Sequence, residues 1–216
     1  MGRPERVRGP GIDAGGRLIN GAARAAAVAD EMGIAMERGA PDGPPVVFDS
    51  PVGWLGVAVS TAGLRRVLLP NSVRRAGAAA RVRLDAVGGG GCAARAVDQI
   101  TQYLRGERRE FELPLDLSPL GTDARTVLEE LRASAPYGKV ITYGELAGRS
   151  GCPGGARGIG QIMARNPLPL VIPCHRVVAA GDLGGYGGGL ALKRRLLRLE
   201  GALTEQLSLL GDPSGP

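Results

Sequence analysis

The 216 residues of the chain, 44% hydrophobic and 22% charged, are typical of a globular protein of one or two domains, and a net charge of +6 favours an anionic partner such as nucleic acid. No stretch approaches the roughly 20 apolar residues of a membrane span and no signal peptide begins the chain, so we expect a cytoplasmic protein with no membrane partner. Three scattered cysteines and one histidine fit neither a disulfide framework nor a structural zinc site, so we expect reduced thiols, no metal and no cofactor.

The first 45 residues are rich in glycine, alanine, arginine and proline. Alanines at helical spacing predict one helix over 22–32, and the segment from Gly39 to Pro45 is typical of a linker. We therefore expect residues 1–45 to be an extension and linker with no assignable chemistry.

Short apolar runs predict a small α/β unit over residues 46–115. Alternating, β-branched segments broken by glycine and proline predict strands over 46–48, 54–59 and 64–69. A helix follows, and Gly106 can end it. The residues on one face of this helix are Ala96, Ile100, Tyr103 and Leu104.

A second unit, for which we expect the bounds 116–205 and a tail over 206–216, begins with a helix that Thr122 is predicted to cap. The buried stripe of that helix is predicted to be Val127, Leu128 and Leu131. Two short helices then follow, over 142–147 and about 154–165, across a glycine-containing turn. This pattern is the outline of a helix-turn-helix.

Four glycines lie in the second of these short helices: Gly154, Gly155, Gly158 and Gly160. Each destabilises a helix by up to about 1 kcal/mol relative to alanine. Two explanations are open. A large partner approaches the backbone closely here, or the glycines let two helices pack tightly.

Prolines at 167, 169 and 173 bias the residues before them away from helix, so we expect the segment 168–172 to be extended. The last element is a helix over 190–203. Its buried stripe is predicted to be Leu192, Leu196, Leu199 and Leu203. Glu200 lies at the margin of this face, where it either has a specific partner or is solvated like most helical glutamates.

The only histidine of the chain, His175, follows Cys174. A thiol reacts as the thiolate, and a nearby imidazole can lower its pKa from about 8.5 to roughly 3.5–7.5. The alternative is a buried cysteine beside a hydrogen-bonded ring, with a structural role only. The pair by itself leaves both explanations open.

The motifs of the second unit are Thr142–Ala147, Gly151–Gly160, Asn166-Pro167, Ile172–Val178, Gly185–Gly189, Lys193 and Leu196–Gly201. Together they resemble the 6-O-alkylguanine-DNA alkyltransferases, the methylated-DNA-protein-cysteine methyltransferases. The similarity extends over about residues 46–203, weakly in the first unit and strongly from Pro136 onward.

The resemblance implies an α+β fold, in which a small α/β, ribonuclease-H-like N-terminal domain precedes a mainly helical C-terminal domain with a winged-helix-like helix-turn-helix. It also implies direct-reversal DNA repair. As a monomer, the protein would bind double-stranded DNA through the minor groove and flip an alkylated guanine out of the duplex. It would transfer the alkyl group irreversibly to its own cysteine, so each molecule would act once.

The resemblance also implies catalytic roles. Cys174 would be the acceptor nucleophile, and His175 the base that activates it through an ordered water, with Glu200 orienting the imidazole. Neighbouring side chains of an extended segment point in opposite directions, so we expect no direct contact between thiol and imidazole. Asn166 would brace the turns around the site, and Tyr143 would contact the guanine and protonate it.

Other positions would bind DNA or the flipped base. Arg157 would enter the base stack in place of the flipped nucleotide, and Ala156 would allow close approach of the phosphates. Arg176 is expected among the residues that bind substrate or DNA. The pocket wall would be formed by Met163, Tyr186, Gly187 and Gly188.

One feature departs from the family: the helix that begins near Thr122 lacks the two aromatic residues that members usually carry there. A second function class is an alkyltransferase-like module that recognises lesions without repairing them. Cys174 argues against it, because those proteins lack the acceptor cysteine. A third class is a thiol hydrolase unrelated to DNA, which would leave the basic, glycine-rich helix 154–165 without a role.

Overall fold

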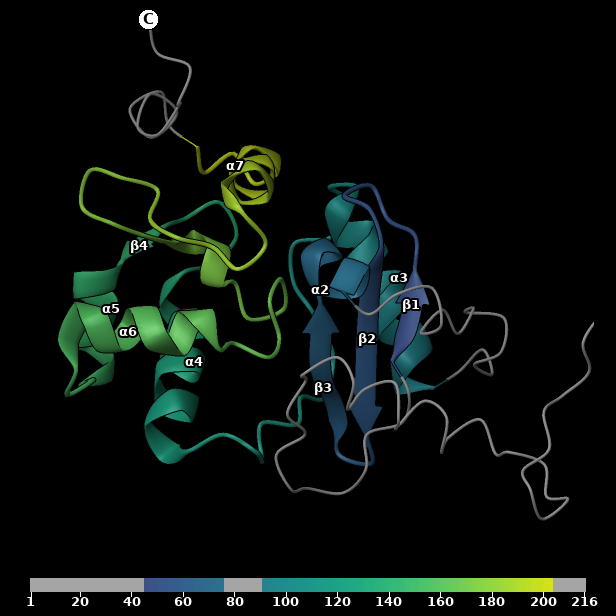
Figure 1. The fold of residues 1–216 in the computed structure, drawn as a ribbon, viewed down its shortest axis with the longest axis horizontal. Coiled ribbons are helices and arrows are strands. Elements are labelled where there is room, and N and C mark those ends of the chain that lie inside the picture. Colours follow the sequence, from purple (N-terminus) through teal and green to yellow (C-terminus); the bar gives the residue numbers. More distant parts are fainter. Residues whose placement is uncertain (1–44, 76–90, 204–216) are drawn as a thin grey trace, which may run out of the picture.

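The computed structural model describes residues 45–75 and 91–203, which form two halves lying side by side (Figure 1). One half holds an antiparallel sheet with helices α2 and α3, and the other is mainly helical. The helix predicted over 22–32 and the tail from residue 206 lie outside the described residues. No described helix has the length and apolar character that a membrane crossing requires.

Three antiparallel strands form the sheet of the first half, in the order β1-β2-β3. They are β1 (Val46–Phe48), β2 (Leu55–Ser60) and β3 (Gly63–Leu68), so the three strands predicted from the alternation are confirmed. The central strand β2 buries Leu55 and Val57 completely. This face of the sheet is therefore part of the hydrophobic core of the first half.

Helix α3 (Cys92–Leu104) packs on the sheet and buries the four residues predicted for its inner face. Gly106, with a φ of 79°, donates its N–H to the Tyr103 carbonyl at 2.9 Å, and the helix ends where predicted. The short helix α2 (Pro70–Arg75) was not predicted. Pro70 suits its first position, because the N–H that proline lacks would have no helical partner there.

The segment that joins the two halves is fixed to strand β3. The N–H of Leu64 donates to the Pro114 carbonyl at 2.8 Å, and the N–H of Asp116 donates to the Leu64 carbonyl at 2.9 Å. The Asp116 carboxylate also accepts from Ser60 and Arg65. These contacts determine where the second half begins relative to the sheet.

Helix α4 (Thr122–Ser134) opens the second half, and its N-cap is Gly121 with no side-chain cap bond. Thr122 is the first helical residue, so the predicted Thr122 cap is wrong. The predicted stripe is confirmed, because Val127, Leu128 and Leu131 are each at most 1% exposed. Aliphatic side chains thus fill this part of the core without the two expected aromatic residues.

Helices α5 (Tyr143–Ser150) and α6 (Gly155–Ala164) pack against each other as the predicted helix-turn-helix. A capping box begins α5: the Thr142 side chain accepts from the N–H of Glu145, and the Glu145 carboxylate accepts from the N–H of Thr142. Gly151, with a φ of 63°, ends the helix. These local signals place Tyr143 at the first turn of α5.

Residues 168–172 form a closed turn, so the predicted extended segment is wrong. The N–H of Ile172 donates to the Leu168 carbonyl at 2.8 Å, and Leu170 has a left-handed φ of 75°. Prolines exclude helix but are equally compatible with turns. Cys174–Arg176 then form a 3₁₀ turn before β5 (Val177–Val178), which pairs in parallel with β4 (Ile141–Thr142).

Helix α7 (Leu190–Leu199) ends earlier than the predicted residue 203, with Glu200 as its C-cap. Its buried residues are Lys193, Leu196 and Leu197. Of the predicted stripe, Leu196 is fully buried, and Leu192 and Leu203 are partly buried against the core, so the prediction is confirmed in part. It missed Lys193 and Leu197, which are both fully buried.

Candidate active site

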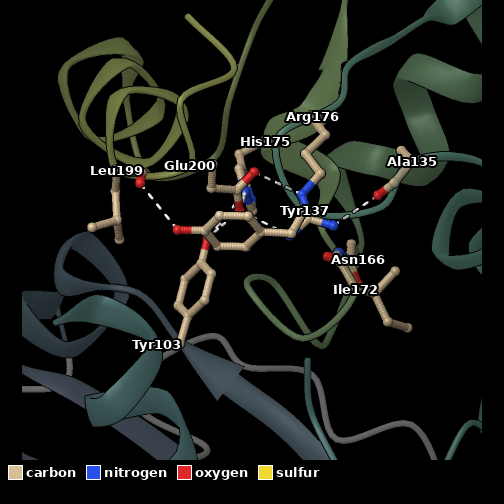
Figure 2. A network of polar contacts seen from close by, with 9 residues as sticks. All are labelled: Tyr103, Ala135, Tyr137, Asn166, Ile172, His175, Arg176, Leu199 and Glu200. Carbon is tan, nitrogen blue, oxygen red and sulfur yellow. Dashed lines mark hydrogen bonds and ion pairs between the residues drawn. The ribbon is translucent and has the colours of Figure 1, made fainter. Parts of the chain in front are cut away.

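A buried carboxylate, Glu200, lies at the end of α7 in the centre of the polar network drawn in Figure 2. Arg176 donates to both of its oxygens, from Nε to Oε2 at 2.9 Å and from Nη2 to Oε1 at 2.8 Å. His175 Nε2 lies 3.0 Å from Oε1, and the Tyr103 hydroxyl donates to the same oxygen at 2.5 Å. Glu200 therefore has specific partners, and the solvated alternative is wrong.

These contacts set the charges of the pair formed by His175 and Glu200. Burial alone would raise the pKa of Glu200, but the hydrogen bonds from His175 and Arg176 outweigh it and hold the pKa at about 2. Burial lowers the pKa of His175, although Glu200 opposes that shift. The site at neutral pH thus combines a carboxylate with an uncharged imidazole.

The tautomer of His175 follows from its neighbours. Nε2 faces the Glu200 carboxylate and must carry the proton, since a carboxylate can only accept. The other nitrogen, Nδ1, is buried and has no hydrogen-bond partner among the described residues. His175 therefore presents a buried, unpaired lone pair, which is what a general base requires.

Cys174 is 6% exposed, and burial raises the pKa of its thiol to about 11. The Asn166 side chain and Lys193 act in the opposite direction without reversing the shift. The expectation that this pKa is lowered is therefore wrong in the resting protein, because burial outweighs every group that lowers it. The thiol is stored protonated and has to lose its proton during any reaction.

Cys174 and His175 share a 3₁₀ turn and not an extended segment, so their side chains are not constrained to point in opposite directions. No hydrogen bond joins His175 Nδ1 to the thiol.

Asn166 ties together the turn that leads to Cys174. Its Nδ2 donates to the Ile172 carbonyl at 2.9 Å, and its Oδ1 accepts from the N–H of Leu168 at 3.0 Å. The nitrogen and the oxygen of the amide thus both bond the backbone of one turn, and this fixes the position of the segment that leads to Cys174.

Lys193 is fully buried on α7, and the sequence suggested no role for it beyond membership of a motif. Its Nζ donates to the carbonyls of Val177, Leu183 and Gly185. Burial lowers its pKa to about 8. The lysine thereby joins the strand after the Cys174 turn to the loop that precedes Tyr186. In the sequence, the signal for a buried role of Lys193 was its place among the apolar residues of the α7 helix.

Two tyrosines flank the thiol. Tyr143 is half-buried, and burial together with the nearby Cys174 raises the pKa of its hydroxyl. Gly184 lies against this ring, because a Cβ at that position would come within 2.8 Å of Tyr143 Cε2. The Tyr186 ring lies 6.3 Å from the His175 ring, with a buried hydroxyl that has no partner among the described residues.

The other residues of the predicted pocket wall lie in α6 and in the loop after Tyr186. Met163 is buried in α6, and Gly187 and Gly188 lie in a turn closed by the N–H of Gly189 on the Tyr186 carbonyl. Ala156 and Arg157 are exposed on the first turn of α6. They lie on a surface and not in the buried network.

Arg176 is only 6% exposed, and its guanidinium is taken up by Glu200 and by the Ala135 carbonyl, 2.7 Å from Nη1. The prediction of Arg176 as a substrate or DNA contact is therefore corrected: it holds the carboxylate in place from within the core.

The glycines of α6 divide between the two explanations. A Cβ on Gly154 would lie 2.9 Å from the Gly158 Cα, and one on Gly158 would lie 3.0 Å from the Cys152 sulfur. These two glycines serve packing within the turn. A Cβ on Gly160 would meet no protein atom within 4 Å, so close packing within the protein does not account for it.

Tyr103 is the site residue that sequence reasoning missed. It comes from α3 in the first half, is fully buried, and reaches Glu200 across the boundary between the halves (Figure 2). It was predicted only as part of an apolar face. The available signal was its hydroxyl, since a buried tyrosine usually finds a hydrogen-bond partner.

Family models match both halves of the chain. The 6-O-methylguanine DNA methyltransferase, ribonuclease-like domain matches residues 46–117, and the 6-O-methylguanine DNA methyltransferase, DNA binding domain matches residues 123–202.

Among curated proteins, the chain is 46% identical over 106 residues to a methylated-DNA--protein-cysteine methyltransferase of Mycobacterium bovis, and 45% identical over 111 residues to one of Mycobacterium leprae. These alignments cover 49% and 51% of this chain. They span 63% and 66% of the length of the two relatives.

Among solved structures, the fold is similar to that of Mycobacterium tuberculosis OGT in complex with DNA, with a TM-score of 0.57 and 36% identity. A crystal structure of Mycobacterium tuberculosis O6-methylguanine methyltransferase gives the same TM-score and identity. Each comparison covers 73% of this chain and 92% of the other chain.

Proposed function

The chain belongs to the 6-O-methylguanine DNA methyltransferase family, and we propose that it repairs alkylated DNA by moving the alkyl group from guanine onto Cys174. Residues 46–115 would be its ribonuclease-like domain and residues 116–205 its DNA-binding and transfer domain. The observation that supports this proposal most strongly is the buried Cys174 thiol in the same turn as a neutral imidazole whose Nδ1 is unpaired.

The reaction balances within these residues. The Cys174 sulfur attacks the alkyl carbon, an S–C bond forms, and the C–O6 bond breaks with its electron pair passing to the guanine. The thiol proton passes to Nδ1 of His175, through a bridging water as the family resemblance implies. The guanine gains a proton from the Tyr143 hydroxyl, which is reprotonated through solvent as the His175 imidazolium releases the proton taken from the thiol, so one proton leaves the thiol and one reaches the base.

Storing the thiol in its protonated form suits a protein that reacts once. A free thiolate is open to oxidation and to alkylation by small molecules, whereas a buried thiol with a pKa of about 11 is inert. Activation would then depend on the correct alkyl group arriving beside the sulfur. Nothing in this chemistry regenerates the thiol, so Cys174 is consumed.

The helix-turn-helix is the surface that would meet double-stranded DNA, in the minor groove. Arg157 and Ala156 are exposed at the start of α6, and the chain carries a net charge of +6. Arg157 would replace the flipped base in the stack, which offsets part of the few kcal/mol that flipping requires. We propose that a monomer does this inside the cell, where its substrate is.

A titration of protein against methylated duplex tests the proposal. The methylguanine lost should equal the protein added, and the intact mass of the protein should rise by one CH₂. Tight binding to the methylated duplex with no change in mass would favour a lesion-binding module instead. Continued loss of methylguanine beyond one equivalent would contradict the consumption of Cys174.

A further inference from the structure

We propose that Tyr103, a residue of the ribonuclease-like domain, is a positioning residue for alkyl transfer that acts on His175 through the Glu200 carboxylate. The inference rests on the proposed transfer to Cys174. It assigns to the first domain a direct part in the chemistry of the second.

The geometry around one oxygen atom carries the argument. Glu200 Oε1 accepts from the Tyr103 hydroxyl at 2.5 Å and from Arg176 Nη2 at 2.8 Å, and His175 Nε2 lies 3.0 Å away. All four side chains are buried, with Tyr103 and His175 completely so. The phenol is therefore shielded from solvent, and removing its hydroxyl leaves this oxygen short of one donor.

The Tyr103 oxygen also lies 3.3 Å from His175 Nε2. Because the phenol proton is committed to Glu200, the atom that Tyr103 presents to the imidazole is an oxygen lone pair. Nε2 is thus faced by two acceptors, the carboxylate and the phenol. Both favour a proton on Nε2, and that arrangement leaves Nδ1 free to accept the thiol proton.

Tyr103 is held in this position by both domains. Its ring contacts Phe111 of the first domain, with centroids 5.3 Å apart, and Tyr137 of the second, edge to face at 6.3 Å. The N–H of Val67 donates to the Pro167 carbonyl at 2.8 Å across the same boundary. The docked position of the sheet domain thereby fixes the phenol on the carboxylate.

The expected effect on His175 has a definite sign. Without the hydrogen bond from the phenol, the Glu200 carboxylate stabilises the His175 imidazolium more strongly. The pKa of His175 therefore rises, and a smaller fraction of the imidazole is neutral at a given pH. The charged and titratable groups that face His175 are Glu200 and Lys193 at α7, Arg176 and Cys174 of its own turn, Tyr186 of the following loop, and Tyr103. Only the last is altered by the test.

The test compares Tyr103→Phe with Tyr137→Phe. Tyr137 is a matched control, because its hydroxyl donates to the Leu199 carbonyl at 3.0 Å, beside Glu200 in sequence, without touching the carboxylate. The rate of transfer from excess methylated duplex is measured by quenched-flow from pH 5 to pH 9. His175 is the only histidine, so ¹⁵N-histidine labelling reports its tautomer and pKa without overlap in the untagged chain.

Tyr103→Phe should transfer the methyl group about ten-fold more slowly at neutral pH, because one hydrogen bond to a buried charge is lost. The acidic limb of its pH–rate profile and the titration of His175 should both move to higher pH. Tyr137→Phe should match wild type in both readouts. Equal rates and equal ¹⁵N titrations for wild type and Tyr103→Phe would overturn the inference while leaving transfer itself intact. Failure of the wild-type chain to transfer would instead overturn the proposed function.

Discussion

Replacement of Glu200 by glutamine tests the electrostatics of the site through stability. The carboxyl pKa is about 2 in the folded protein against 4.5 for an unperturbed glutamate, and the group is 5% exposed. A lowered folded pKa stabilises the fold above the unfolded pKa, and this contribution fades as the pH falls from about 4.5 towards 2. The shift corresponds to about 3 kcal/mol at pH 7 and about 1 kcal/mol at pH 3.

Glu200→Gln keeps the size of the side chain and removes its charge, which leaves Arg176 buried without a carboxylate. Denaturant unfolding should therefore show a loss of about 3 kcal/mol at pH 7 that shrinks to about 1 kcal/mol at pH 3. Glu107→Gln, at an exposed position, is the control and should change little at either pH. An equal loss for Glu200→Gln at both pH values would refute the reasoning, because it would indicate lost packing and not lost charge.

Three further predictions concern the transfer site and the DNA surface. Asn166→Ala removes both side-chain bonds to the 168–172 turn and leaves only its backbone bond, so we expect transfer at least about ten-fold slower in single-turnover assays; wild-type rates would show that the turn holds without Asn166. Gly160→Ala should raise stability by up to about 1 kcal/mol in thermal unfolding, since its Cβ meets no protein atom, and yet weaken duplex binding measured by anisotropy; unchanged binding would remove the case for close DNA approach. Arg157→Ala should slow repair of methylated duplex more than reaction with the free alkylguanine base, and equal losses on both substrates would contradict a role in replacing the flipped base.

The sequence predicted the elements well wherever the signal was local. Alternation identified the strands of the sheet, and the helix-turn-helix followed from helical segments separated by glycine. The prediction of a cap at Thr122 failed because glycine is also favoured at N-caps, so residue preference alone does not choose between Gly121 and Thr122. The turn at 168–172 failed because prolines exclude helix without choosing between strand and turn.

The candidate site divides in the same way. Cys174, His175 and Glu200 were found through motifs, but the protonated thiol was not, because its pKa is set by burial that only the folded chain creates. Tyr103 was missed because its partner lies 97 residues away in the other domain. Arg176 was expected among the residues that bind substrate or DNA, and only the structure gives it a buried carboxylate and carbonyl as partners.

The most direct test of the central claim is to locate the methyl group. After reaction with methylated duplex, peptide mass spectrometry should find a single added methyl on Cys174, with Cys92 and Cys152 unmodified, and Cys174→Ser should gain none. A methyl group on either of the other cysteines, or repair of the duplex by Cys174→Ser, would contradict the assignment of Cys174 as the acceptor.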